Sequence, residues 1–274
     1  MNDLRKLQLI QLDILKDIDK ICKDNNLQYY LIAGTLLGAV RHHGFIPWDD
    51  DIDIAMYRED LCKLEEIITL QYSHKYSIQN CWTDNKFTRF ITKVRLNNTK
   101  MIEADEYYDP DSKNVGIWID IFPIDYVEKT GLDLKVRELG LRFFSALIVA
   151  KHLNISKRKT TKLKRVLYYI LKYITKYINH SFIVKSYENI CTKSSKQSSS
   201  YSTIFMSAYG CKKELVPNGV YGSGKKIIFE GHEFTAPNEY EYLLRAIYGD
   251  YMMLPPVEKR ITDHRIEVID YGNY

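Results

Sequence analysis

Four aspartates lie within a stretch of five residues early in the chain: Asp49, Asp50, Asp51 and Asp53. If residues 51–55 form a strand, side-chain alternation places Asp51 and Asp53 on one face and the intervening isoleucines on the other, toward a core. Two carboxylates this close repel each other unless a cation lies between them. Mg²⁺ (or Mn²⁺), which prefers oxygen ligands and is often shared with substrate phosphates, is therefore the expected cofactor.

Two other readings of the acidic run are weaker. A solvated acidic loop is disfavoured because the apolar residues within 48–54 predict a half-buried segment. A calcium-binding loop would place three of the aspartates at its first, third and fifth positions. That loop also needs glycine at its sixth position and glutamate at its twelfth, where this chain has Ile54 and Asp60. The EF-hand reading therefore fails.

A second apolar segment, residues 116–123, contains a single aspartate. Alternation predicts a strand with isoleucines on one face and Asp120 on the other, between Trp118 and Phe122. A lone carboxylate is costly to bury unless it is paired or binds a metal. A hydrogen-bonded structural aspartate is the alternative; we take Asp120 as the third carboxylate of the site.

Several further elements are expected to position these carboxylates. Apolar residues at three- and four-residue spacing predict a first amphipathic helix: Leu4, Leu7, Ile10, Ile14, Ile18 and Ile21. Residues 29–33 read as a buried strand, and Gly34 and Thr35 as a turn into a helix over 36–41, whose amides could bind phosphate. Other expected elements are helices at 60–70 and 239–247 and strands at 76–81, 88–96 and 101–107.

Residues 219–226 nearly match a P-loop but do not fit one. The motif lacks the Ser or Thr that binds Mg²⁺, and it leads into residues 227–229, which predict a strand rather than a helix. We therefore predict a basic hairpin there and no NTPase.

Composition indicates an ordinary globular protein. The net charge of +4 is modest and gives no reason to expect a nucleic-acid partner. The five scattered cysteines form no CxxC pair, which suits a reducing compartment. The first residues contain no signal-peptide pattern and no apolar run is long enough to span a membrane. We therefore expect a cytoplasmic protein, in contact with the inner face of the cell membrane if its basic region binds lipid.

That basic region extends from residue 139 to residue 187, which contains no acidic residue. Apolar residues recur at helical spacing between 163 and 178, with lysines and arginine on other faces. Three readings stay open: a core-packed helix with a solvated basic face, a surface for anionic lipid, or a surface for a polyanionic acceptor.

Three blocks of the chain resemble the LicD family, which includes bacterial phosphocholine transferases and is related to fukutin and fukutin-related protein. They are AGTLLGAVRHHGFIPWDDDIDIA, GIWIDIFPID and YGDYMMLPPVEKRITDHR, in the family's order. The resemblance implies an α+β fold with a nucleotidyltransferase-like mixed β-sheet core flanked by helices, to which this chain adds a basic helical region. We expect a catalytic core over 1–130, a basic helical insertion over 131–205 and a C-terminal segment over 206–274 that completes the active site.

The resemblance also implies a reaction: metal-dependent transfer of a phosphoalcohol, phosphocholine first, from a CDP-activated donor to a hydroxyl of a cell-surface glycan, with CMP leaving. The acceptor would be a teichoic acid, lipopolysaccharide or capsule precursor, which can be lipid-linked. Asp51, Asp53 and Asp120 are the expected catalytic and metal-binding residues. The expected donor-binding residues are Gly34, Thr35, Arg41, His42, Lys93 and Arg95, and the expected substrate-binding residues are Trp48, Lys259, Arg260 and His264.

Two alternatives from other classes remain. Nucleotidyl transfer to a different acceptor would use the same metal site and differ only in the phosphorus that is attacked. A non-catalytic glycan- or membrane-binding protein could keep the fold, although such a module would gain nothing from three intact carboxylates.

Overall fold

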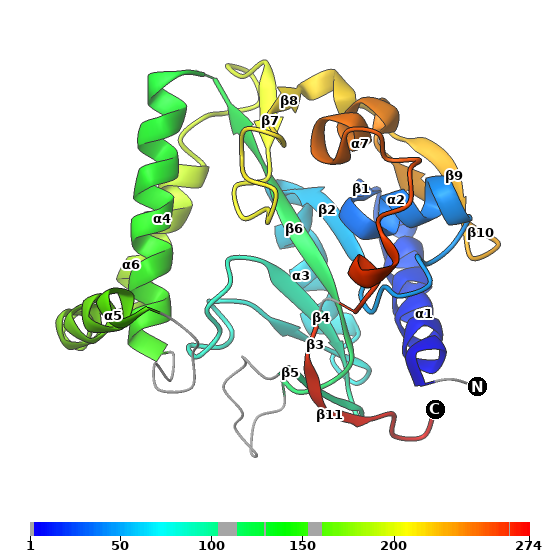
Figure 1. Cartoon of the computed structure of the whole chain (residues 1–274), viewed down its shortest axis with the longest axis horizontal. Coiled ribbons are helices and arrows are strands. Elements are labelled where there is room, and N and C mark those ends of the chain that lie inside the picture. Colours follow the sequence, from blue (N-terminus) through cyan, green and yellow to red (C-terminus); the bar gives the residue numbers. More distant parts are fainter. Residues whose placement is uncertain (1–2, 104–113, 129, 153–160, 263) are drawn as a thin grey trace.

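A mixed sheet forms the centre of the computed structural model, which describes residues 3–103, 114–128, 130–152, 161–262 and 264–274 (Figure 1). The strand order is β1 (Tyr29–Leu31), β2 (Asp53–Tyr57), β6 (Trp118–Val127), β4 (Thr92–Leu96) and β3 (Tyr76–Gln79). The end of β6 pairs antiparallel with β7 (Tyr201–Thr203), which pairs with β8 (Val216–Pro217). The pair β2 and β6 is parallel, and its neighbours are antiparallel. The long central strand β6 therefore organises the sheet.

Helices flank this sheet, as expected for the α+β fold class. They are α1 (Asp3–Asp24), α2 (Ala33–His42), α3 (Arg58–Gln71), α4 (Leu132–His152), α5 (Lys162–Thr175), α6 (His180–Cys191) and α7 (Tyr240–Tyr248), with short 3₁₀ helices η2 (Asn218–Val220) and η3 (Val257–Lys259). Two small antiparallel pairs complete the described structure: β9 (Lys225–Phe229) with β10 (His232–Ala236), and β5 (Lys100–Glu103) with β11 (Ile266–Asp270). No helix among the described residues has the length and apolar character needed to cross a bilayer.

The buried apolar side chains form two hydrophobic cores. The larger joins the N-terminal and C-terminal parts of the chain, with Leu15, Ile54 and Leu244 each fully buried in it. The smaller lies under α4 and α6 and includes Ile148 and Ile183. In Figure 1 these two helices stand beside the sheet, and the C-terminal segment returns across the sheet to β11. The end of the chain is thereby brought back to pair with β5.

Comparison with the predicted elements confirms some and corrects others. The first amphipathic helix and the strand predicted over 227–229 are confirmed. The hairpin predicted over 219–226 lies later in the chain, over 225–236, and residues 218–220 form a 3₁₀ helix instead. Gly34 and Thr35 do not form a turn before the helix; they lie in the first turn of α2, which starts at Ala33. The strand β2 begins at Asp53, two residues later than predicted, and the backbone N–H of Asp53 donates to a side chain of α2. The strand expected over 88–96 is confined to 92–96, and the part of the strand expected over 104–107 lies outside the described residues.

Gly116, just before β6, lies where the backbones of β6 and β4 approach each other closely. A Cβ added at Gly116 would lie 2.0 Å from the carbonyl oxygen of Leu96, so the backbone would have to move. We expect Gly116→Ala to destabilise the fold by about 1–3 kcal/mol, which at roughly 2–4 °C per kcal/mol is readily measured as a fall in Tm. Gly219→Ala, whose Cβ would meet open space, is the control. Equal Tm values for the two variants would contradict this packing.

Candidate functional site

Two of the three predicted carboxylates lie side by side on adjacent strands. Asp53, the first residue of β2, is aligned with Asp120 on β6, and Asp120 is aligned with Lys93 on β4. Residues aligned across neighbouring strands project from the same face, so the three form a row. Nζ of Lys93 lies 3.1 Å from Oδ1 of Asp120 and 3.8 Å from the ring centroid of Trp118. One carboxylate of the row is thus neutralised by a buried cation.

Asp51 joins this row from the loop before β2. Burial raises the pKa of Asp51 to about 6; the charge of His264 opposes the shift, and the carboxylates of Asp120 and Asp50 add to it. Burial, followed by the carboxylates of Asp51 and Asp120, raises the pKa of Asp53 well above its ordinary value. Simultaneous ionisation of these buried carboxylates is therefore unfavourable unless a cation offsets their charge.

His264 lies among three acidic side chains. Its Nδ1 is 3.0 Å from Oδ1 of Asp50 and 3.8 Å from Oδ2 of Asp51, and its Nε2 is 3.3 Å from Oε1 of Glu103. The pairing of β11 with β5 places it there, because Ile266 is aligned with Glu103. Burial lowers the pKa of His264, but the hydrogen bond to Asp50 and the nearby carboxylates outweigh burial and raise it to about 9. His264 is therefore an imidazolium at neutral pH.

The start of α2 fixes the acidic loop at close range. Thr35 Oγ1 accepts a hydrogen bond of 2.8 Å from the backbone N–H of Asp53. A Cβ added at Gly34 would lie 2.6 Å from Oδ2 of Asp49, so glycine is needed for this close approach. The two residues of the predicted phosphate-binding turn thus contact the two ends of the acidic run.

Helix α1 holds the same loop from another side. Nε2 of Gln8 donates to the carbonyl oxygen of Asp49 at 2.8 Å, and Nε2 of Gln11 donates to the carbonyl oxygen of Asp50 at 3.0 Å. Both glutamines are buried. Buried loop carbonyls need such partners because an unpaired one costs about 1–3 kcal/mol. The aspartates are therefore carried on a loop with a fixed backbone.

A group of basic and aromatic side chains lies at the other end of α2. The guanidinium of Arg41 donates to backbone carbonyls in the segment 251–253. The Arg260 guanidinium carbon lies 5.6 Å from the ring centroid of Trp48, and the His42 ring meets the same indole edge-on. Burial, and the charge of Arg260, lower the pKa of Arg41. The predicted residues Arg41, His42, Trp48 and Arg260 are thus brought together.

Tyr248 lies within electrostatic range of both the basic group and the carboxylates, namely of Arg41, Asp53 and Asp49. Its hydroxyl lies 2.5 Å from that of Tyr209. A ligand carrying phosphate groups could therefore contact the acidic and the basic ends of one site.

Other predicted residues are placed differently from the expectation. Arg95 is fully buried; its guanidinium donates to Gln79 and to the carbonyl of Gly116 and lies over the Trp118 ring. Lys93 is also fully buried, so neither of these two predicted donor-binding cations has exposed surface with which to contact a donor. We propose instead that Lys93 fixes Asp120 and that Arg95 supports the Trp118 ring. Lys259, in η3, is exposed.

Three structural residues of the site were not predicted from the sequence. Asp50 was counted within the acidic run but given no role, although it is buried and pairs with His264. Glu103 lies at the end of a short strand and gave no signal, because only its pairing with β11 brings it to the site. Gln11 lies on the buried face of α1, and a polar side chain among apolar ones on such a face indicates a specific hydrogen-bond partner.

The carboxylate set fits a divalent metal ion. Oδ1 of Asp53 and Oδ2 of Asp50 are buried and have no hydrogen-bond partner among the described residues. One oxygen each of Asp50 and Asp51 and one nitrogen of His264 lie within 4.8 Å of one another, so these residues could hold a metal ion. His264 could bind such an ion only after losing its proton, because a protonated imidazole has no free lone pair for a metal. While it is protonated, it is a charge partner of Asp50.

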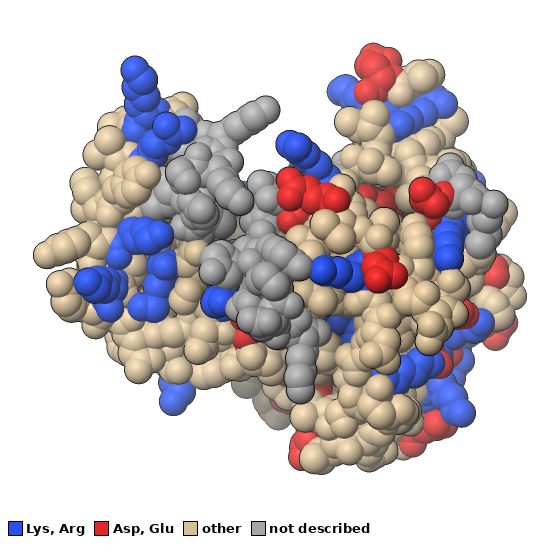
Figure 2. Space-filling model, turned by 90° about the horizontal axis from the view of Figure 1, so that it is seen from below, with Lys and Arg blue, Asp and Glu red and all other residues tan. Residues whose placement is uncertain are grey.

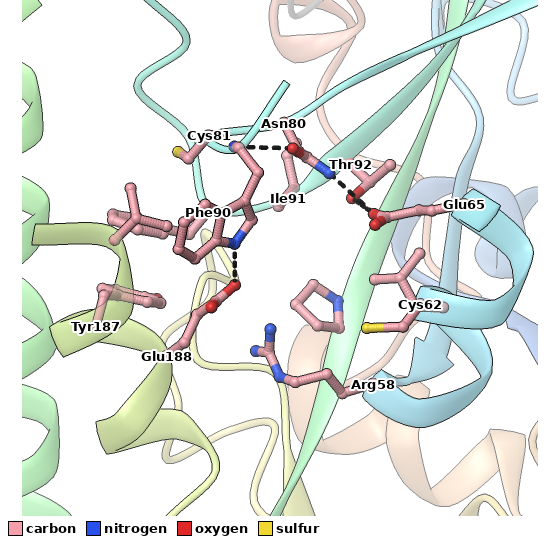
Figure 3. A pocket seen from close by; sticks show the side chains of 14 residues that line it. Arg58, Cys62, Glu65, Asn80, Cys81, Phe90, Ile91, Thr92, Tyr187 and Glu188 are labelled. Atoms are coloured by element: carbon pink, nitrogen blue, oxygen red, sulfur yellow. Dashed lines mark hydrogen bonds between the residues drawn. The ribbon is translucent and has the colours of Figure 1, made fainter. Parts of the chain in front are cut away.

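A separate cavity of about 190 Å³ lies between α3 and α6 (Figure 3). Thr92 lines it, and strand alternation puts Thr92 on the face opposite to its neighbour Lys93. In the figure Glu65, from α3, accepts a hydrogen bond from Asn80. The Trp82 indole N–H donates to Glu188 of α6 at 2.7 Å. None of the predicted site residues lines this cavity. The carboxylate row and the cavity are thus on opposite faces of the sheet.

Comparison with known proteins agrees with this geometry. The family model described as LicD/FKTN/FKRP, nucleotidyltransferase domain, matches residues 26–136, which include the predicted carboxylates. The chain is 30% identical over 272 residues to the lipopolysaccharide cholinephosphotransferase LicD of Haemophilus influenzae, covering 95% of this chain and 96% of that protein. The chain therefore belongs to the LicD family. It is also similar to human ribitol 5-phosphate transferase FKRP, with 46% identity over 41 residues, 15% of this chain and 8% of that protein.

Thr35 offers a direct test of how the acidic loop is held. Thr35→Val removes the acceptor for the buried N–H of Asp53, which should cost about 1–3 kcal/mol and lower the Tm accordingly. Thr35→Ser keeps the hydroxyl and should restore most of that loss. If the valine and serine variants melt at the same temperature, the hydrogen bond from Asp53 does not stabilise the loop.

His264 offers a test by pH. Its pKa of about 9 exceeds the ordinary value of 6.5, so its contribution to stability is fully present below pH 6.5 and is lost as the pH rises through about 9. In a chelator-containing buffer we expect His264→Gln to lower the Tm at pH 6 and to have little effect at pH 10. A deficit of the same size at both pH values would contradict the charged pairing.

Proposed function

We propose that the protein transfers a phosphoalcohol, phosphocholine first, from a CDP-activated donor to a hydroxyl of a cell-surface glycan precursor. The observation that carries this proposal is the row of Asp53 and Asp120 with Asp51 beside it. Further support is the full-length similarity to a lipopolysaccharide cholinephosphotransferase. The shorter similarity to a ribitol 5-phosphate transferase supports phosphoalcohol transfer more generally.

In this proposal Asp51, Asp53 and Asp120 hold Mg²⁺ or Mn²⁺. Such an ion neutralises charge on the diphosphate and orients it. Asp120, fixed by its ion pair with Lys93, either completes the ligand set or accepts the proton of the acceptor hydroxyl. The positive charge of His264 offsets part of the negative charge of the acidic run. The aspartate oxygens are proposed to bind the cation.

The basic group is proposed to bind the donor. Arg41 and Arg260 present guanidinium groups to the same region, and charge-assisted contacts of this kind suit phosphate oxygens. His42 and Trp48 would contact the donor beside them, while the close approach at Gly34 keeps the α2 N-terminus next to the carboxylates. Thr35 is proposed to act by positioning Asp53, and Lys259 by contact with the acceptor.

The proposed transfer forms one bond at phosphorus and breaks another. The acceptor oxygen forms a bond to the phosphorus that bears the alcohol, the bond from that phosphorus to the bridging oxygen breaks, and CMP leaves. The proposed acceptor is a teichoic acid, lipopolysaccharide or capsule precursor, which can be lipid-linked. We further propose that the protein works at the inner face of the cell membrane and has no nucleic-acid partner.

Nucleotidyl transfer is the second candidate function, and the name of the matching domain family favours it. It would attack the nucleotide's own phosphorus at the same carboxylates and leave the nucleotide on the acceptor. Mass spectrometry of the modified acceptor separates the two: a phosphoalcohol adduct supports the first function and a CMP adduct the second.

The experiment that tests the main proposal supplies CDP-choline, CDP-ribitol or CDP-glycerol with Mg²⁺ and a glycan acceptor and measures CMP. We expect CDP-choline to be the best donor and Asp53→Asn to reduce the rate at least about 100-fold, because losing a metal ligand removes several kcal/mol at about 1.4 kcal/mol per tenfold. Asp13→Asn, at an exposed aspartate paired with Lys16, is the control. An Asp53→Asn rate within about tenfold of wild type would overturn the metal assignment.

A further inference from the structure

Helix α5 exposes a large apolar surface. Leu163 is 81% exposed, Tyr173 68% and Tyr177, just beyond the helix, 73%. Other large apolar side chains on it are about half exposed: Val166, Leu167, Tyr169, Ile170 and Ile174. A soluble helix normally buries its apolar face against a core, so the core-packed reading of this segment is wrong for the exposed side chains of α5.

The exposed apolar side chains form one stripe that faces away from the protein. Positions 163, 166, 167, 170, 173, 174 and 177 follow three- and four-residue spacing, which puts them on one side of a helix. Thr175 is fully buried and Leu171 is packed against the smaller core. The carbonyl of Thr175 accepts from Lys151 of α4 at 2.7 Å, which anchors that other side. The stripe is therefore held outward.

The flank of this stripe is basic. Lys162, Arg165, Lys172 and Lys176 are exposed and fall on the helix side next to the apolar stripe. The sequence from 139 to 187 has no carboxylate to oppose them. Figure 2 shows blue and tan atoms, with little red, over the left part of the face where this helical region lies. Lys157, Arg158 and Lys159 lie outside the described residues.

We propose that α5 docks on an anionic lipid bilayer, lying in the plane of the interface with its apolar stripe inserted and its basic flank against lipid phosphates. A short amphipathic helix with lysine and arginine beside a wide apolar face binds membranes in this way. At 14 residues it is too short to span a bilayer. A polyanionic glycan would satisfy the charges but leave the apolar stripe in water. A second copy of this chain would bring two basic flanks together.

The proposal goes beyond the transferase function and does not depend on it, because binding to lipid is measured without substrate. The experiment sediments the full-length protein with vesicles of equal parts phosphatidylglycerol and phosphatidylcholine, and with vesicles of phosphatidylcholine alone. We expect binding to the anionic vesicles to be at least about tenfold stronger than to the neutral ones and to weaken as salt is added.

Two matched double variants distinguish insertion of α5 into the bilayer from binding through exposed apolar residues elsewhere on the surface. Leu167→Glu with Ile170→Glu should reduce binding to anionic vesicles at least about tenfold. Leu70→Glu with Ile228→Glu, at exposed apolar positions on α3 and β9, should leave it unchanged. Circular dichroism and Tm confirm that each variant is folded. Absence of vesicle binding, an unaffected Leu167/Ile170 variant, or a wild-type dimer that this variant dissolves would overturn the proposal.

Discussion

Repulsion between clustered carboxylates is the constraint on which this structure depends. The half-buried site gathers the acidic run and Asp120 on one face of the sheet, and burial raises the pKa of both Asp51 and Asp53. Two cations of the protein offset part of that charge, Lys93 beside Asp120 and the imidazolium of His264 beside Asp50. The remaining repulsion between the carboxylates is what a divalent cation would relieve in the proposed function.

The fold supports this charge arrangement with backbone contacts. The parallel pairing of β2 with β6 sets Asp53 against Asp120, and the antiparallel pairing of β6 with β4 adds Lys93. Glutamines of α1 satisfy the loop carbonyls behind the aspartates, and Thr35 of α2 receives the first N–H of β2. Segments far apart in the sequence thus fix the backbone of the acidic loop. The aspartates are held close together as a result.

Charge is also distributed unevenly between the two parts of the molecule. The carboxylates and their partners belong to the larger core, whereas the segment with α5 lacks acidic residues over its whole length. In the proposed function, the acidic part binds a cation and a donor, and the basic part brings the enzyme to an anionic surface on which a lipid-linked acceptor would lie. The two properties are carried by separate elements and can be altered separately.

The sequence by itself determined the acidic region, Asp120, the first amphipathic helix and the strand at 227–229, because periodicity and composition over a few residues fix such local features. The blocks resembling the LicD family were also visible there. Only the tertiary structure decided that Arg95 is buried, that His264 meets Asp50 and Glu103, and that the apolar stripe of α5 is exposed. Each of these depends on contacts between residues distant in the chain, and a local pattern carries no information about which distant segment will cover it.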